Sequence, residues 1–208
     1  MKILFATTNK AKVKRYANQL KERNIDIITL NDLNIELDVE EDGLNPIENA
    51  IIKASAYAKV SKLPTIALDE GLFLDNVPND LQPGVNVRRV NGKRLNDQEM
   101  IIHYTSLVDE YGEDGQLNGY FLKGIAIVNG EKTITHQSKA PRCFLNKSSK
   151  VIDEGYPLAS IQLVPEFNKF KSELTKEEEE LITNFEQIEI LDFIINTVQN
   201  LEPKEQVK

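Results

Sequence analysis

The spacing of hydrophobic residues in the first third of the chain predicts strands that alternate with helices. Short continuous apolar runs are typical of buried strands, and apolar residues that recur every three or four positions are typical of amphipathic helices. Pro46 lies near the start of the second helix, where the N–H that proline lacks would have no partner. The expected elements are a strand at residues 3–5, a helix at 10–23, a strand at 25–30, a helix at 46–60 and a strand at 64–68 that ends at an acidic pair.

The pattern beyond residue 70 predicts a more antiparallel section. Asn129-Gly130 is a strong turn signal between two strand-like runs and predicts a hairpin. Thr175 with Glu178 three residues later forms the pattern of a capping box and predicts the start of a helix. The other expected elements are a loop at 76–84, a helix at 97–111, strands at 120–128 and 132–138, a loop at 148–156 and a final helix at 186–200.

No repeat or dividing linker interrupts this pattern, so we expect one α/β domain over residues 1–208 with a frayed tail at 202–208. Of the 208 residues, 40% are hydrophobic, which is too many for a disordered chain. The net charge of −8 argues against a protein that binds a nucleic-acid polymer through a basic face.

Neither a membrane span nor a secretion signal is expected, because no apolar run approaches the roughly 18 residues that a membrane helix needs and the N-terminus has no signal-peptide pattern. We therefore expect a cytoplasmic protein. The single cysteine, Cys143, excludes an internal disulfide and a cysteine-cluster metal site, and two histidines argue against a histidine-rich one.

The turn between the first strand and the first helix is rich in hydrogen-bond donors and positive charge. It holds Thr7, Thr8, Asn9, Lys10 and Lys12. Free N–H groups at a helix N-terminus attract anions, so this turn is a candidate phosphate cradle, although it lacks the glycines of a Walker A loop. The alternative is an ordinary helix start followed by a solvated lysine face.

Two groups of carboxylates are candidates for metal or acid–base chemistry. Residues 38–43 gather acidic side chains of the kind that bind Mg²⁺ or Ca²⁺. Their spacing approaches an EF-hand, but Asn49 stands at the twelfth position and a strand precedes the loop, so we reject that motif. Asp69 and Glu70 follow a strand, where ligand chemistry is common in α/β sheets, and Asp69 could hold a metal or take a proton from water. The alternatives are an acidic surface loop and an acidic turn.

Two lysines could act as point charges for phosphate. Lys53 lies on the helix that follows the acidic loop, and Lys169 lies in a loop near Pro165. A lysine considered alone is more often a solvated surface group.

Taken together, these segments resemble the inosine triphosphate pyrophosphatases, which cut inosine, xanthosine and deoxyinosine triphosphates to monophosphate and pyrophosphate. The resemblance covers nearly the full length, and its most specific part is EEDGLNPIENAIIKA, similar to the family's EE-x-G-x-x-x-x-ENA-x-x-KA. The other matches are ATTNKAK to AT-x-N-x-x-K, ALDEGLFLD to ADDSGL-x-VD, PGVNVRR to PG-x-x-SAR, and VPEFNKFKSELTKEE to VP-x-x-x-K-x-x-x-ELT-x-EE.

The resemblance implies a long mixed β-sheet with flanking helices, two lobes around a central nucleotide cleft, and a homodimer. It also implies a Mg²⁺-dependent nucleoside triphosphate pyrophosphohydrolase, with Glu40, Glu41 and Asp69 as metal ligands. Asp69 would orient or deprotonate the attacking water, with Lys12 and Lys53 as catalytic cations that, with Lys169, neutralise the triphosphate. The implied substrate-binding residues are Thr7, Thr8, Asn9, Lys10, Lys12, Lys53, Glu70, Tyr156, Lys169 and Asn184.

The sequence departs from the family mainly in the part that reads the base. Leu68 replaces the first aspartate of the DDSG run, and Glu70 replaces its serine. The FGYDP segment reads EGYPL at residues 154–158, and the SHR motif reads TNF at residues 183–185. The phosphate and metal half is therefore kept, and the base-reading half is not.

Three functions are compatible with this uneven pattern. The first is a pyrophosphohydrolase for aberrant purine nucleotides such as ITP, XTP and dITP, with altered or relaxed base specificity. The second is a catalytically degenerate homodimer that binds nucleotides or regulates. The third is a hydrolase of a different phosphorylated substrate, because Glu70 and the lost base clamp would suit another shape.

Overall fold

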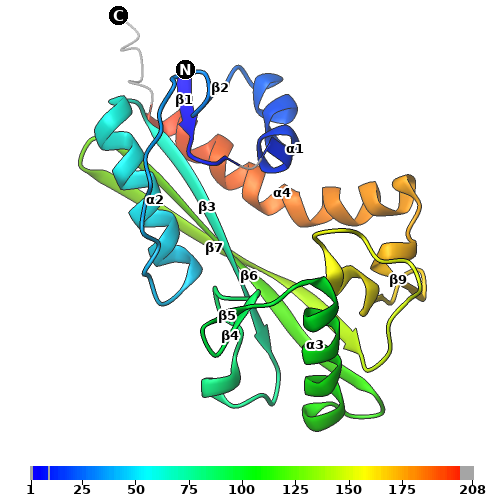
Figure 1. The fold of residues 1–208 in the computed structure, drawn as a ribbon. Coiled ribbons are helices and arrows are strands. Elements are labelled where there is room, and N and C mark those ends of the chain that lie inside the picture. The colour runs from blue at the N-terminus through cyan, green and yellow to red at the C-terminus, as the bar shows by residue number, and fades with distance from the viewer. Residues whose placement is uncertain (1, 9, 202–208) are drawn as a thin grey trace, which may run out of the picture. The chain divides into compact units, whose positions relative to one another are not determined.

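The computed structural model describes residues 2–8 and 10–201, except for the side chains of residues 10–12, 14, 15, 18, 184 and 185. Helices alternate with strands in the first third, and a long hairpin follows (Figure 1). The helices are α1 (Lys10–Lys21), α2 (Pro46–Ser61), α3 (Asp97–Tyr111) and α4 (Lys176–Leu201). The strands are β1 (Lys2–Phe5), β2 (Asp26–Thr29), β3 (Thr65–Leu74), β4 (Arg89–Val90), β5 (Lys93–Arg94), β6 (Gln116–Asn129), β7 (Lys132–Leu145), β8 (Gln162–Val164) and β9 (Lys169–Phe170).

Seven of the strands form one mixed sheet in the order β2-β1-β3-β6-β7-β8-β9, and β4 pairs separately with β5. β1 runs parallel to both β2 and β3, whereas β8 is antiparallel to both β7 and β9. This topology confirms the expected α/β class with a long mixed sheet and a more antiparallel middle section.

The chain separates into two compact units. The first comprises Met1–Glu70, Lys123–Ser138 and Glu186–Lys208, and the second comprises Gly71–Leu122 and Lys139–Phe185. β3, β6, β7 and α4 each contribute residues to both units. The single domain and the central cleft that the resemblance implies stay predictions.

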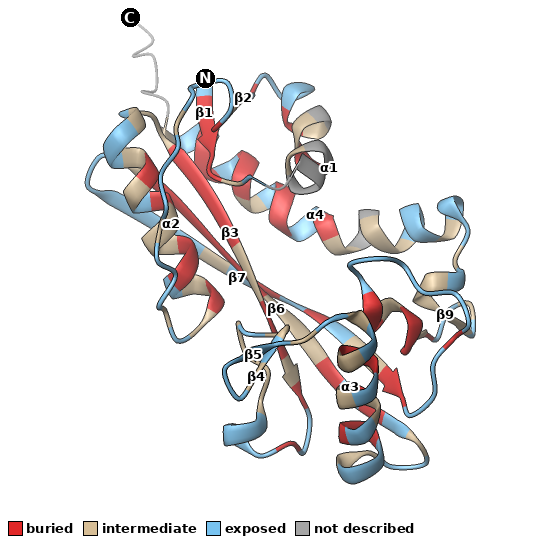
Figure 2. Cartoon of the chain, in the orientation of Figure 1, coloured by how far each residue is buried: buried red, intermediate tan, exposed pale blue. Residues whose placement is uncertain are grey.

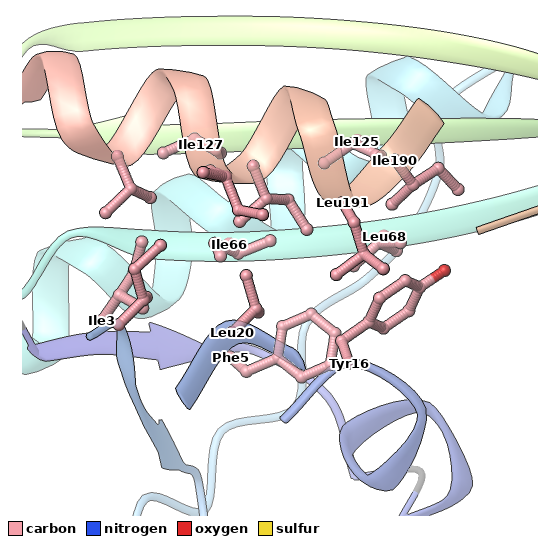
Figure 3. Close-up of a cluster of buried hydrophobic side chains, with 14 residues drawn as sticks. Ile3, Phe5, Tyr16, Leu20, Ile66, Leu68, Ile125, Ile127, Ile190 and Leu191 are labelled. Atoms are coloured by element: carbon pink, nitrogen blue, oxygen red, sulfur yellow. The ribbon is translucent and has the colours of Figure 1, made fainter. Parts of the chain in front are cut away.

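Helices cover both faces of the sheet in the first unit. Side chains along a strand alternate between the two faces, so the helices bury both sets of side chains. β1 and the first half of β3 are almost fully buried as a result (Figure 2). Ile3 and Phe5 point into a cluster with Ile66, Leu68, Ile125 and Ile127 from the sheet, where Tyr16 and Leu20 of α1 and Ile190 and Leu191 of α4 pack on them (Figure 3).

α2 covers the opposite face of this unit and approaches it closely. The side chains that meet α2 there are mostly small, including Ala67 and Ala126, and they pack against Ala50, Ala54 and Tyr57 of the helix. Gly124 of β6 lies directly under the start of α2, where an added Cβ would stand 2.5 Å from the carbonyl carbon of Pro46. A side chain at Gly124 would therefore push the first turn of α2 away from the sheet.

The second unit has its own core, in which α3 packs on the sheet. Leu72 and Leu74 of β3 and Phe144 of β7 meet Tyr104 and Leu107 of α3 there. α3 starts with a capping box, because the Asn96 side chain accepts from the Glu99 N–H and the Glu99 side chain accepts from the Asn96 N–H.

Four elements differ clearly in extent from the sequence prediction. β3 continues through the acidic pair to Leu74, because the apolar alternation resumes at Leu72 and outweighs two partly exposed carboxylates. β6 and β7 are both longer than expected and run over 14 residues each around the Asn129-Gly130 turn. The two helices expected at the C-terminus are one helix of 26 residues, because no glycine or proline interrupts it.

The start of this helix was predicted correctly. The Thr175 hydroxyl accepts from the Glu178 N–H at 3.3 Å, and the Glu178 carboxylate accepts from the Thr175 N–H at 2.9 Å. The two bonds form the capping box that the sequence indicated.

Candidate active site

The entry into α2 is fixed by a set of short hydrogen bonds around Glu48. Asn45 is the N-cap, and its side-chain oxygen accepts from the Glu48 N–H at 3.0 Å. The Glu48 carboxylate in turn accepts from the Leu44 N–H at 2.7 Å and from the Asn45 side-chain amide at 2.8 Å. The first bond satisfies an N–H group that a helix start leaves without a partner inside the helix, and the other two hold the residues just before the helix. Glu48 therefore shapes the acidic loop just before the helix.

Asn49, one residue further on, joins the acidic loop to the central strand β3. Its Nδ2 donates to Asp69 Oδ2 at 3.0 Å, and its Oδ1 accepts from the Gly43 N–H at 2.8 Å. The side chain is buried, with 3% of Asn49 exposed. The acidic loop, α2 and β3 thus meet at a single amide.

Lys53 lies one helical turn beyond Asn49 and faces the same loop, since residues four apart share a helix face. Its Nζ lies 2.7 Å from Glu41 Oε2. The Tyr57 hydroxyl, another turn along, donates to the Leu37 carbonyl at 2.8 Å. Burial and the charges of Glu41 and Asp38 raise the pKa of Tyr57, which keeps its hydroxyl protonated as the donor.

The environment of Asp69 raises the pKa of its carboxyl. Burial is the largest cause, and the negative charge of Glu41 adds to it. The hydrogen bond from Asn49, the charge of Lys53 and the backbone N–H of Glu70 oppose the shift. Asp69 is therefore a half-buried group whose charged form is stabilised by Asn49 and Lys53 of α2 and destabilised by Glu41 of the loop.

The carboxylates around Asp69 suit a magnesium ion whose other ligands would be phosphate oxygens of a substrate and water. Over residues 2–8 and 10–201, no group of three or more His, Cys, Asp or Glu side chains is placed to hold a metal by itself. Mg²⁺, however, binds through one or two carboxylates together with substrate phosphates and water. The negative charge of Glu41 raises the pKa of Asp69, and the positive charge of Lys53, which lies 2.7 Å from Glu41, lowers it.

The remaining residues expected in the first unit are only partly described. Glu40 is exposed, Thr7 and Glu70 are half-buried, and Thr8 is exposed. Asn9 lies outside the described residues, and so do the side chains of Lys10 and Lys12. The phosphate cradle predicted at this turn therefore stays a prediction.

Three expected site residues lie in the second unit, namely Tyr156, Lys169 and Asn184. Lys169 Nζ lies 2.7 Å from Glu178 Oε1, the same glutamate that caps α4. The hydrogen bond from Lys169 is the largest cause that lowers the pKa of Glu178. Tyr156 is exposed in the loop at residues 148–156, and the side chain of Asn184 lies outside the described residues.

The loop that carries Tyr156 is anchored through its neighbour Gly155. Arg88 donates to the Gly155 carbonyl at 2.9 Å and to Asp97 at 2.6 Å, and the Gly155 N–H donates to the other oxygen of Asp97 at 2.7 Å. Three groups distant in sequence thus close one ring of hydrogen bonds, which holds the segment that stands at the place of the FGYDP motif.

Sequence reasoning assigned no role to two contacts that the structure brings out. Asn49 belongs to the matched motif. Its sequence signal is a polar residue in the helix directly before an alanine, Ala50, that the structure buries. Lys123 is 4% exposed on β6 and pairs with Glu186 of α4 at 3.1 Å. Its signal was a lysine inside an apolar strand, which calls for a buried partner.

Comparisons with known proteins agree with this fold and these motifs. The model of the Ham1 family matches residues 3–184, and the chain belongs to that family. The chain is 30% identical to a dITP/XTP pyrophosphatase of Escherichia coli over 202 residues, covering 96% of this chain and 98% of that protein. A dITP/XTP pyrophosphatase of Yersinia pseudotuberculosis is 29% identical over 185 residues, or 88% and 91% of the two chains.

Solved structures show the same fold. A HAM1 protein from Coxiella burnetii superposes with a TM-score of 0.77 at 23% identity, covering 96% of this chain and 99% of that one. The Staphylococcus aureus Ham1 protein gives 0.72 at 24% identity, covering 95% and 100%. Within the described residues, no helix is both long and apolar enough to cross a lipid bilayer.

Proposed function

We propose that this chain is a nucleoside triphosphate pyrophosphatase that converts aberrant purine nucleotides to monophosphate and pyrophosphate. The observation that carries the proposal is the cluster of Asp69, Asn49, Lys53 and Glu41, which builds a charged, partly buried site from the most family-specific segment. The names of the relatives, dITP/XTP pyrophosphatases, support the choice of substrates.

In the proposed reaction, Asp69 orients the attacking water and accepts one of its protons. The water oxygen bonds to the α-phosphorus, and the bond from that phosphorus to the bridging oxygen of the pyrophosphate breaks. The raised pKa of Asp69 makes its carboxylate a better base than an exposed aspartate.

A divalent metal is part of this proposal, with Mg²⁺ as the preferred ion. Glu40, Glu41 and Asp69 would hold it, and when bound it would supply positive charge to the phosphate oxygens. Lys53 lies beside the same carboxylates and would neutralise charge that develops on the leaving pyrophosphate. Lys12 and Lys169 would contribute further positive charge to the triphosphate.

An altered base preference is the second part of the proposal. Glu70 and Tyr156 stand where the family has a serine and a base-reading segment, and Asn184 stands in the place of the SHR histidine. We propose that these substitutions change which base is preferred and leave the pyrophosphate chemistry intact. The predictions of a homodimer and of a cytoplasmic location stay predictions.

The test is the variant Asp69→Asn, which keeps the shape of the side chain and removes its charge. Pyrophosphate release from dITP and XTP in the presence of Mg²⁺ should fall at least about 100-fold below the unsubstituted protein, which is the lower end of a general-base contribution. A variant with undiminished turnover would remove Asp69 from the mechanism.

A further inference from the structure

We propose that Asn49 is a positioning residue that holds the Asp69 carboxylate and the Glu41-bearing loop in one arrangement for the reaction. The inference deepens the proposed function and rests on it. None of the roles considered so far gives Asn49 a part in the chemistry, although its side chain touches both halves of the carboxylate cluster.

The two ends of the amide have different partners, and each partner accepts just one orientation of it. The Gly43 N–H can only donate, so it needs the amide oxygen at 2.8 Å. The Asp69 carboxylate accepts, so it needs the amide nitrogen at 3.0 Å. A flipped amide would set two donors against each other at one end and two acceptors at the other. The chemistry of the partners therefore fixes the orientation of Asn49.

The burial of Asn49 makes this arrangement costly to lose. With 3% of the residue exposed, water cannot easily replace a missing partner. A buried polar group left without a hydrogen bond carries its full desolvation penalty. The loop and β3 are therefore coupled, because displacing either one breaks a bond of the same buried side chain.

Gly43 has no room for a side chain, and this restricts the loop further. A Cβ at Gly43 would stand 2.6 Å from Asn49 Oδ1 and 2.7 Å from Glu48 Cβ. The close approach of the loop backbone brings Glu41, two residues earlier, to Lys53 on the same face of α2. The position of Glu41 thus depends on the contact between Gly43 and Asn49.

Holding a reacting carboxylate in one rotamer is a recognised use of a second, supporting layer of hydrogen bonds. Removing such a supporting partner typically lowers activity or metal affinity by about 10- to 100-fold. We expect the same range here, and we expect it to appear in kcat and in the Mg²⁺ dependence more than in KM. The reason is that Asn49 contacts the carboxylate and the loop, whereas the proposed substrate contacts come from the lysines.

The sharpest variant is Asn49→Asp, because it keeps the acceptor for the Gly43 N–H and replaces the donor to Asp69 with a second carboxylate oxygen, which repels it. Steady-state pyrophosphate release from dITP should show kcat lowered by about 10- to 100-fold, a higher Mg²⁺ requirement and a KM within about threefold of the unsubstituted value. The matched control is Asn96→Asp, which changes the same residue type at the cap of α3, where aspartate caps equally well. Its kcat should be unchanged.

The double variant Asn49→Asp/Asp69→Asn separates positioning from simple stabilisation. In this double variant the amide at position 69 can donate to the carboxylate at position 49, so the hydrogen bond forms in the opposite direction. Its Tm should therefore recover relative to Asn49→Asp. Its kcat should stay as low as that of Asp69→Asn. If Asn49→Asp does not fold, Gly43→Ala displaces the loop from the other end of the amide and should lower kcat in the same range.

Two results would overturn the inference, and they differ from a failure of the proposed function. Unchanged kcat and Mg²⁺ dependence in folded Asn49→Asp, with Asp69→Asn inactive, would leave the function standing and remove the role of Asn49. A lowered Tm with unchanged kcat would reduce Asn49 to a structural residue. Full activity in Asp69→Asn would instead contradict the proposed function itself.

Discussion

Lys53 Nζ and Glu41 Oε2 lie 2.7 Å apart, and this pair joins the acidic loop to the helix that follows it. Lys53 is the more buried partner, with 16% of its side chain exposed against 36% for Glu41. A triphosphate that binds here would meet a lysine already aimed at the carboxylates. Substrate phosphate and Glu41 would then share the same cation.

The variant Lys53→Met should lower kcat/KM for dITP by about 30-fold. A hydrogen bond to a charged group contributes about 2 kcal/mol, which corresponds to that factor. Steady-state kinetics measure the effect, and Lys59→Met is the matched control because Lys59 is an exposed lysine on the same helix. Equal losses in the two variants would show that general charge, and not the position of Lys53, matters.

Lys169 is held by Glu178, and its release should strengthen substrate binding if it contacts phosphate. Glu178→Gln removes the negative partner, while glutamine can still accept from the Thr175 N–H in the capping box. The KM for dITP should fall, and the free energy of unfolding should change little because the pair is partly exposed. An unchanged or higher KM would remove Lys169 from the phosphate site.

Removing one partner of the pair Lys123 and Glu186 should cost more stability than removing both partners. Lys123→Met leaves a carboxylate at a mostly buried position and should lower the free energy of unfolding by about 3 kcal/mol. The double variant Lys123→Met/Glu186→Leu removes both charges and should recover most of that loss. Urea denaturation measures both. A double variant as unstable as the single one would mean that the attraction within the pair outweighs the desolvation of its charges.

The ring of Arg88, Asp97 and Gly155 should make stability depend on pH in the acid range. The hydrogen bond from Arg88, that from the Gly155 N–H and the charge of Arg88 lower the pKa of Asp97 in the folded state. Its stabilising contribution is therefore complete above the unfolded pKa, about 3.9, and is lost as the pH falls through the lower folded value.

Thermal unfolding from pH 7 to pH 2.5 tests this ring. The difference in Tm between the unsubstituted protein and Asp97→Asn should be largest near neutral pH and should shrink below about pH 4. A difference that stays constant across this range would show that Asp97 acts through hydrogen-bond geometry alone, without its charge.

Much of the first unit could be predicted from the sequence because local patterns and packing agree there. The alternation at Ile3, Leu4 and Phe5 places successive side chains in two different cores, one on each face of the sheet. The helix from Pro46 onward follows from local chemistry that needs no distant partner, and so does the capping box of Thr175 and Glu178 in the second unit. Such elements can be identified from a single sequence.

What could not be predicted depends on partners that are distant along the chain. The acidic pair after Leu68 resembles a turn, and only the neighbouring strands show that β3 continues to Leu74. Asn49 and Asp69 are 20 residues apart, so the sequence gives no sign of their hydrogen bond. A lysine inside an apolar strand indicates that Lys123 needs a partner, but the sequence does not show that Glu186, 63 residues away, supplies it.

The most direct measurement of the central claim is product analysis of dITP and XTP hydrolysis, with Mg²⁺, by the unsubstituted protein and by Asp69→Asn. The account predicts one pyrophosphate and one monophosphate per substrate consumed, and near-complete loss in the variant. Release of orthophosphate in place of pyrophosphate, or no turnover of any nucleoside triphosphate by folded protein, would contradict it.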